Sequence, residues 1–341
     1  MAHLRSGLKY FVLGALAVYG WIRMRLTSKS TLIILTYHRI LPDHHSDRHV
    51  EQPGMVTSPE VLRSHIRLMQ SVGAVPVHLD DWLSMRVKNE YLPKLSFALT
   101  FDDGWQDNYR YAFPVLSSEA TPATIFLVTG LLDTHRVFWP EQILKLLTSA
   151  ALDKSSPEFQ WLCPFLPSES SSDSPLTLEQ ADEVISRLKA LDDKTILDHL
   201  AGVPKAAVAA TPEESFRPIL NSTELSEMAA SNLVRFGAHT QNHFRLNRID
   251  SAPTLRDEIV GCQEDLKRLG RSAVPIFCYP NGDITADGQK LVKENYQAAC
   301  TTKIGWNPQS RDAFDLRRFN LHDGNSSSPR KLFATIGRGI L

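Results

Sequence analysis

Three short polar clusters in this sequence each follow directly on a predicted apolar strand. They are Thr100–Gly104 (TFDDG), His239–His243 (HTQNH) and Tyr279–Gly282 (YPNG). In parallel α/β folds the carboxyl ends of the strands meet at one edge of the sheet, and active sites usually form there. We therefore expect the three clusters to lie together.

The first two clusters carry side chains that bind metals. Asp102 and Asp103 are adjacent, and Gly104 permits a sharp turn that can direct both carboxylates toward one centre. His239 and His243 have the spacing i, i+4, which predicts both imidazoles on one face of a helical turn. Two histidines and one carboxylate suit a divalent transition metal and leave positions open for water and substrate.

Each of these patterns also has a plainer interpretation. Aspartates often end strands because they hydrogen-bond the following turn. Many His-x-x-x-His pairs are ordinary surface or core residues. The shared position of both patterns at strand ends favours a metal site over these alternatives.

The elements that must position these residues alternate between strands and helices, a pattern typical of an α/β fold with a mainly parallel sheet. Ser58-Pro59-Glu60 predicts a helix start, Thr254–Leu269 a helix that ends at Gly270, and Leu176–Leu191 a further helix. The predicted strands are Leu32–Thr36, Leu95–Phe101, Ala123–Val128, Val234–Ala238, Val274–Tyr279 and Gln297–Thr301.

One stretch interrupts the alternation, from about residue 141 to residue 220. It contains helical segments and a Ser/Pro-rich run at Pro164–Pro175. We interpret it as an insertion with a flexible surface loop. Plain connecting helices are favoured there over a substrate-binding role.

Composition and charge exclude several classes of function. The chain has 341 residues, and its 37 Lys+Arg against 38 Asp+Glu give no basic field that would draw it to nucleic acid. Its four cysteines form no C-x-x-C pair, so the sequence indicates neither a zinc ribbon nor a disulfide framework.

The N-terminal segment is basic and apolar. Tyr10–Ile22 carries no charge and is flanked by Lys9, Arg23 and Arg25. As a helix it would reach about 20 Å, short of a hydrocarbon core of roughly 30 Å, so it could span only if the flanking side chains snorkel. A helix lying in the membrane interface and a buried helix of the domain are the alternatives. We expect residues 1–30 to associate with a membrane of the cell envelope and residues 31–341 to form the catalytic domain.

The ordered set TFDDG, HTQNH and FCYPNG, with Thr36–Arg39 (TYHR) near the first strand, resembles the NodB-homology polysaccharide deacetylases of carbohydrate esterase family 4. The resemblance runs from about Leu32 to Leu341 and is weakest over the insertion. The third motif resembles a branch with the form F-x-Y-P-x-G. The fold that the resemblance implies is a distorted (β/α) barrel with a helical insertion.

The resemblance also implies a ligand set and a mechanism. Asp103, His239 and His243 match the ligands of one divalent metal, zinc first and cobalt, nickel or manganese as alternatives. Asp102 matches the general base, which takes a proton as the amide carbonyl is attacked. The backbone N–H of Tyr279 matches the group that stabilises the oxyanion.

Many relatives carry an arginine in the third motif, and this sequence has none there. Arg318, in DLRRFNLHD, is our candidate for the missing charge. His322 is the expected general acid, and His38 is the other candidate. Tyr279, Trp105, His38 and Pro280 are expected to contact substrate, Trp105 by stacking on a sugar ring.

The function expected from this resemblance is metal-dependent removal of N-acetyl groups from N-acetylhexosamine units of a cell-envelope polysaccharide, an exopolysaccharide or a lipid-linked glycan. One alternative is hydrolysis of another non-peptide C–N bond on the same metal site. The other is a catalytically silent carbohydrate-binding or assembly protein. The intact set of Asp102, Asp103, His239 and His243 counts against the silent protein.

Overall fold

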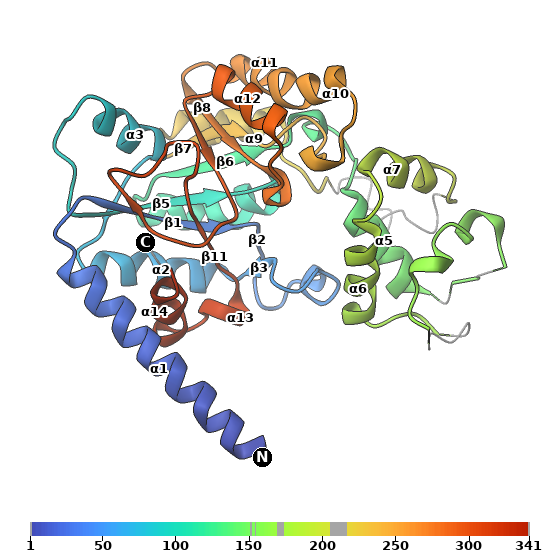
Figure 1. Ribbon diagram of the computed structural model, residues 1–341, viewed down its shortest axis with the longest axis horizontal. Helices are drawn as coiled ribbons and strands as arrows, with labels where there is room; N and C mark the ends of the chain where they lie inside the picture. The colour runs from blue at the N-terminus through green and yellow to red at the C-terminus, as the bar shows by residue number, and fades with distance from the viewer. Residues whose placement is uncertain (1, 151, 154, 169–173, 205–216, 340–341) are drawn as a thin grey trace.

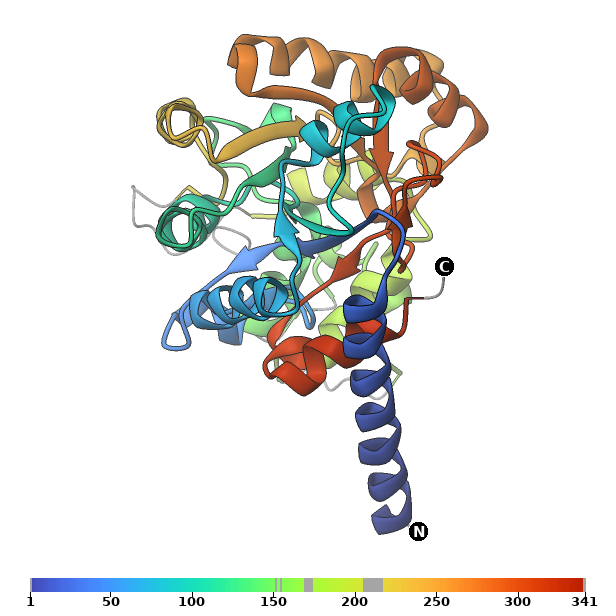
Figure 2. The ribbon, with the colours of Figure 1, turned by 90° about the vertical axis from the view of Figure 1, so that its left-hand side faces the viewer.

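A computed structural model describes residues 2–150, 152–153, 155–168, 174–204 and 217–339. The described residues form a curled nine-stranded sheet in the order β10-β1-β5-β6-β7-β8-β9, with β11 beside β1 and β4 beside β5 (Figures 1 and 2). The central strands are parallel: β1 (Thr31–Tyr37), β5 (Leu95–Phe101), β6 (Ala123–Leu127), β7 (Val234–Ala238), β8 (Ala273–Cys278) and β9 (Ala298–Cys300).

The predicted fold class, a distorted barrel of parallel strands, is confirmed, and so are all six predicted strands. β1 and β5 are buried along their whole length, as expected for parallel strands covered on both faces. The two-residue strands leave no pattern in the sequence and were not predicted. They are β2 (Arg39–Ile40), β3 (Val56–Thr57), β4 (Val75–Pro76), β10 (Asn307–Pro308) and β11 (Phe319–Asn320).

Helices cover the outside of the sheet. The predicted start of α2 is confirmed, because the Ser58 hydroxyl accepts a hydrogen bond from the Val61 N–H and Pro59 follows it. The predicted helix at 254–269 is α10 and α11 joined by a π-helical turn, and the chain reverses at Gly270 (φ 57°). The bounds are α2 (Pro59–Ser71), α3 (Leu79–Val87), α4 (Phe113–Ser118), α9 (Ser222–Ala230), α10 (Ala252–Arg256), α11 (Cys262–Leu266), α12 (Ala286–Asn295), α13 (Asp323–Ser326) and α14 (Pro329–Gly337).

The insertion forms a small helical unit beside the open end of the barrel (Figure 1). It consists of α5 (Trp139–Ser149), α6 (Leu178–Leu188) and α7 (Asp193–Ala201), so it begins two residues before the expected boundary. These helices share a hydrophobic core of their own. Part of the predicted Ser/Pro-rich loop, residues 169–173, lies outside the described residues.

The N-terminal segment is a long helix, α1 (Ala2–Leu26), whose first half extends away from the body of the molecule (Figure 2). Its second half packs on α14 with almost no space between the backbones. A Cβ at Gly20 would lie 2.3 Å from the Phe333 carbonyl oxygen, and one at Gly337 would lie 2.3 Å from that of Leu16. Among the described residues, no helix combines the length and apolar character that crossing a membrane requires.

Candidate active site

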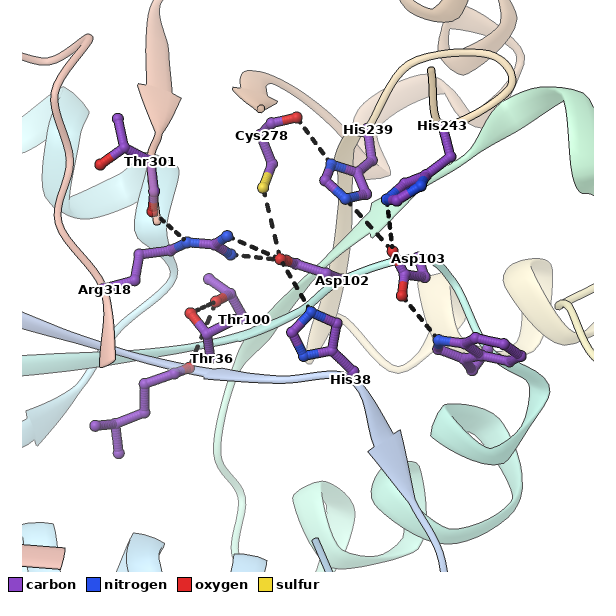
Figure 3. Close-up of polar contacts among 12 residues, drawn as sticks. Thr36, His38, Thr100, Asp102, Asp103, His239, His243, Cys278, Thr301 and Arg318 are labelled. Atoms are coloured by element: carbon purple, nitrogen blue, oxygen red, sulfur yellow. Dashed lines mark hydrogen bonds and ion pairs between the residues drawn. The ribbon is translucent and has the colours of Figure 1, made fainter. Parts of the chain in front are cut away.

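The two aspartates leave the end of β5 in different directions (Figure 3). Asp103 (φ 76°) and Gly104 (φ 77°) both adopt the left-handed conformation, which turns the chain sharply after Asp102. The Asp102 N–H donates to the Tyr37 carbonyl at 2.9 Å and thereby ties the end of β5 to the end of β1. Asp102 is 3% exposed and Asp103 5%, so each buried carboxylate needs its own partner.

Asp103 faces both histidines of the second cluster. Its Oδ1 lies 3.4 Å from His239 Nε2 and 3.4 Å from His243 Nε2. These three atoms lie within 4.8 Å of one another, an arrangement that could hold a metal ion. The donor set therefore fits the metal that the sequence predicts.

The predicted helical turn at the histidines is wrong. Residues 239–243 form an irregular loop in which Thr240 (φ 65°) and His243 (φ 62°) have left-handed backbones. The loop is closed by the His243 N–H, which donates to the Thr240 hydroxyl, and by the Asn242 N–H, which donates to the buried Glu258 carboxylate. Tertiary contacts, not helical spacing, bring the imidazoles together.

Neighbouring groups orient the three ligands. His239 Nδ1–H donates to the Cys278 carbonyl at 2.8 Å, which leaves Nε2 free to bind a metal. The Trp105 indole N–H donates to Asp103 Oδ2 at 2.9 Å, so Oδ1 is the oxygen that faces the histidines. Burial lowers the pKa of His243 to about 4, so its imidazole is neutral at neutral pH, the form that ligates metals.

The Trp105 ring packs against a buried arginine. The guanidinium of Arg39 lies 4.3 Å from the centre of the Trp105 ring. Arg39 is buried and forms ion pairs with Asp107 and Glu51, which fix its position. Trp105 is 1% exposed and is not among the described residues that line the cavity. The structure thus places it against Asp103, one of the potential metal ligands.

Arg318 reaches Asp102 from the other side of the site. Its Nη1 and Nη2 donate to Oδ1 and Oδ2 of Asp102 at 2.7 and 2.8 Å, and its Nε donates to the Thr301 carbonyl (Figure 3). Burial alone would raise the pKa of Asp102, but the Arg318 charge and its hydrogen bonds lower that pKa below its ordinary value. Asp102 is therefore an anion at neutral pH.

The two candidate acids lie in different places. His38 follows β1, lines the cavity, and places Nε2 3.9 Å from Asp102 Oδ2. His322 is the residue before α13, and it is not among the described residues that line the cavity. The structure brings only His38 to the aspartates.

The third cluster is placed at the site with one difference from expectation. Tyr279 lines the cavity, and the next residue, Pro280, is buried. The Tyr279 N–H, which the resemblance assigns to the oxyanion, donates to the Cys300 carbonyl at 3.2 Å. A reacting oxyanion would have to compete with that carbonyl for the same hydrogen.

The site opens into a cavity of about 530 Å³, and one wall of it comes from the insertion. Sequence reasoning did not predict this wall. The signal was present in α6, where Asp182, Ser186 and Lys189 follow the i, i+4, i+7 spacing of one helical face. The other lining residues of the insertion are Trp139, Pro140, Glu141 and Asp193.

Replacing Trp105 with Phe tests its part in holding the metal ligand. The ring remains but the hydrogen bond to Asp103 Oδ2 is lost, so Asp103 can rotate. We expect the affinity for zinc, measured by calorimetry on chelator-stripped protein, to fall about ten-fold or more. Trp82→Phe is the matched control, because Trp82 is equally buried and its indole N–H has no partner among the described residues. Equal zinc affinity in both variants would contradict the assignment.

Comparisons with known proteins agree with this geometry. The polysaccharide deacetylase family model matches residues 89–154 and 201–299, and the unmatched residues between them hold α6 and most of α7. No curated protein matches the chain.

Three solved structures share the fold. The deacetylase PplD of Streptococcus pyogenes, solved with acetate, is 18% identical with a TM-score of 0.56, over 91% of this chain and 99% of that one. IcaB from Ammonifex degensii is 18% identical with a TM-score of 0.52, over 90% of this chain and 97% of that one. A de-N-acetylase from Aggregatibacter actinomycetemcomitans is 15% identical with a TM-score of 0.53, over 89% of this chain and 99% of that one. By its family match, its fold and its site, this chain is an enzyme of the polysaccharide deacetylase family.

Proposed function

We propose that this enzyme is a metal-dependent N-deacetylase of N-acetylhexosamine units in a cell-envelope polysaccharide, exopolysaccharide or lipid-linked glycan. One observation carries the proposal. The Asp103–His239–His243 cluster and the Asp102–Arg318 pair open into the same cavity. A potential ligand set beside an independent carboxylate suits hydrolysis of an amide.

Asp103 Oδ1, His239 Nε2 and His243 Nε2 would hold the metal, with zinc as the first candidate. The metal would supply Lewis acidity toward water and the acetamide carbonyl. The residues of the chain keep this ligand set in place: the Cys278 carbonyl fixes the tautomer of His239, and Trp105 fixes the rotation of Asp103.

Asp102 is the general base of the proposed reaction. Its carboxylate is deprotonated over the neutral range because Arg318 lowers its pKa, and it lies beside the ligand set. Arg318 acts through Asp102 as a positioning residue. The bidentate pair fixes the plane of the carboxylate as well as its charge.

His38 is the group that protonates the departing amine. It lies on the cavity wall 3.9 Å from Asp102, and its Nδ1 is buried without a partner among the described residues. His322 was the first candidate from the sequence, and its position outside the cavity lining favours His38 for this step.

The enzyme associates with a membrane surface through α1. The face opposite α14 exposes apolar side chains, among them Phe11 (74% exposed), Val18 and Ile22. Arg25 and Lys29 are exposed near its end, where they can meet anionic headgroups. An envelope glycan is a reasonable substrate for an enzyme held at that surface.

Acetate release tests the activity. Chelator-stripped protein with added zinc should release acetate from N-acetylglucosamine oligomers or from envelope polysaccharide, and protein without metal should not. Asp102→Asn should lower the rate about 10²- to 10⁴-fold, the usual contribution of a general base. The proposal would be refuted if acetate were released at the same rate without metal, or at the same rate by the Asp102→Asn variant.

The pH dependence of kcat/KM tests Arg318. The base must be deprotonated to act, and Arg318 keeps its pKa low. In Arg318→Met the pKa of Asp102 should rise, so the acidic limb should move to higher pH and the rate below neutrality should fall. An unmoved acidic limb would remove Arg318 from this role.

The rates of two alanine variants separate the two histidines. His38→Ala should lose most of the activity, whereas His322→Ala should retain it. The reverse result would restore His322 as the acid.

Co-sedimentation with lipid vesicles tests the membrane proposal. The protein should bind phosphatidylcholine vesicles more tightly when they contain phosphatidylglycerol. In the triple variant Phe11→Ser/Val18→Ser/Ile22→Ser the affinity for vesicles should fall at least about ten-fold, because the apolar area available for burial is lost. Val87→Ser/Tyr91→Ser is the control, since both residues are exposed and neither belongs to α1. Equal loss in both variants would contradict a role for α1.

A further inference from the structure

Helix α6 presents a polar face to the active-site cavity. Asp182, Ser186 and Lys189 lie on one side of the helix and all line the cavity. The other side packs into the core of the insertion through Ala181, Val184, Ile185 and Leu188. The polar residues are therefore held over the site by the burial of the opposite face.

The two ends of this polar face contact different parts of the barrel rim. Asp182 Oδ1 accepts a hydrogen bond from Gln52 Nε2 at 2.8 Å, and Gln52 lies in the segment between β2 and β3. Lys189 Nζ donates to Asn281 Oδ1 at 3.1 Å, and Asn281 lies in the turn after β8. Asp182 and Lys189 are seven positions apart, which corresponds to about 10 Å along the helix, so α6 bridges the cavity.

The bridge is anchored to the metal-ligand loop. Arg245, two residues after His243, donates from its guanidinium to the carbonyls of Lys189 and Leu191 at 2.7 Å each. It also forms a buried ion pair with Asp193, to which the Trp139 indole N–H donates. The carbonyls that follow α6 are thus fixed by a charged group that is itself buried.

A residue that lines the cavity carries a buried polar atom that has no hydrogen-bond partner among the described residues. Glu141 Oε2, in the first turn of α5, is buried without a hydrogen bond among the described residues. Glu141 lines the cavity. A sugar hydroxyl is a group that could satisfy this atom, because a buried polar atom without a partner costs free energy.

A bridged cavity limits which part of a glycan can reach the aspartates. An internal unit of a long chain needs a groove with two open ends, and α6 crosses this one with contacts on both sides. The volume of about 530 Å³ falls within the roughly 300–1,000 Å³ that hold a small ligand. It suits one or two sugar units rather than a stretch of polymer.

From these observations we infer that the enzyme takes its substrate end-on and deacetylates the terminal N-acetylhexosamine of a glycan, with Glu141 hydrogen-bonded to a hydroxyl of that sugar. The inference rests on the proposed deacetylase function and narrows its substrate class. Chain ends and short glycans are substrates, and internal units of a long polymer are not.

The position of acetate loss tests the inference directly. A hexamer of N-acetylglucosamine treated with zinc-loaded enzyme should lose acetate from one terminal unit only, as mapped by tandem mass spectrometry. The rate per chain should be the same for the trimer and the hexamer. Loss from internal units at a comparable rate would overturn the inference.

A binding measurement keeps this test separate from the proposed activity. The Asp102→Asn variant should bind one molecule per chain, whether the oligomer is short or long, in calorimetric titrations. Glu141→Ala in that background should weaken binding about ten-fold. End-on recognition would be overturned if the number of enzyme molecules bound per oligomer rose with chain length, or if no oligomer bound. Single-site binding without acetate release would overturn only the proposed activity.

A double variant tests the bridge. Gln52→Ala/Lys189→Ala removes one partner from each cross-cavity hydrogen bond and should raise the internal-to-terminal ratio of acetate loss at least about ten-fold. Lys194→Ala/Asp198→Ala is the matched control, because it removes an exposed ion pair on α7. An unchanged ratio in the first variant would overturn the role of these two contacts.

Discussion

The site depends on the burial of two adjacent carboxylates at the end of one strand. Removing Asp102 and Asp103 from water is costly unless each has a partner of its own. The left-handed backbone at Asp103 separates the two side chains, so one carboxylate meets Arg318 and the other meets the histidines. These partners come from residues far along the chain, so the charges are compensated only when the sheet has closed around them.

Different partners also separate the roles of the two aspartates. Arg318 occupies both oxygens of Asp102, whereas Trp105 occupies one oxygen of Asp103 and leaves the other facing the histidines. Asp102 lies close enough to His239 and Cys278 to form a second potential metal group. The Arg318 charge competes with a metal for Asp102, and burial raises the pKa of the Cys278 thiol and so disfavours the thiolate that a metal requires. Electrostatics therefore favours the Asp103 group.

The sequence predicts the sheet and the ligands better than it predicts their surroundings. The apolar runs identify the strands because each strand is buried along most of its length. The backbone at His243 was mispredicted because Glu258 and the Thr240 hydroxyl, which are not visible in local spacing, stabilise a non-helical loop. Arg318 was found only through resemblance to a family, since no local pattern links residues 216 positions apart. The orientation of α6 required knowing where its apolar face is buried.

The insertion and the barrel are stabilised in different ways, which bears on how specificity can change. The insertion buries its own apolar residues, so α6 can be substituted on its polar face without disturbing the packing of β5 or β7. The two units are nevertheless coupled through Arg245, which is buried against Asp193 and lies two residues from His243. A change that displaces α6 would therefore also displace His243, a potential metal ligand, because Arg245 and His243 are only two residues apart. Residues on the polar face, such as Asp182, can alter substrate choice, whereas the Asp193–Arg245 pair constrains both substrate access and ligand geometry.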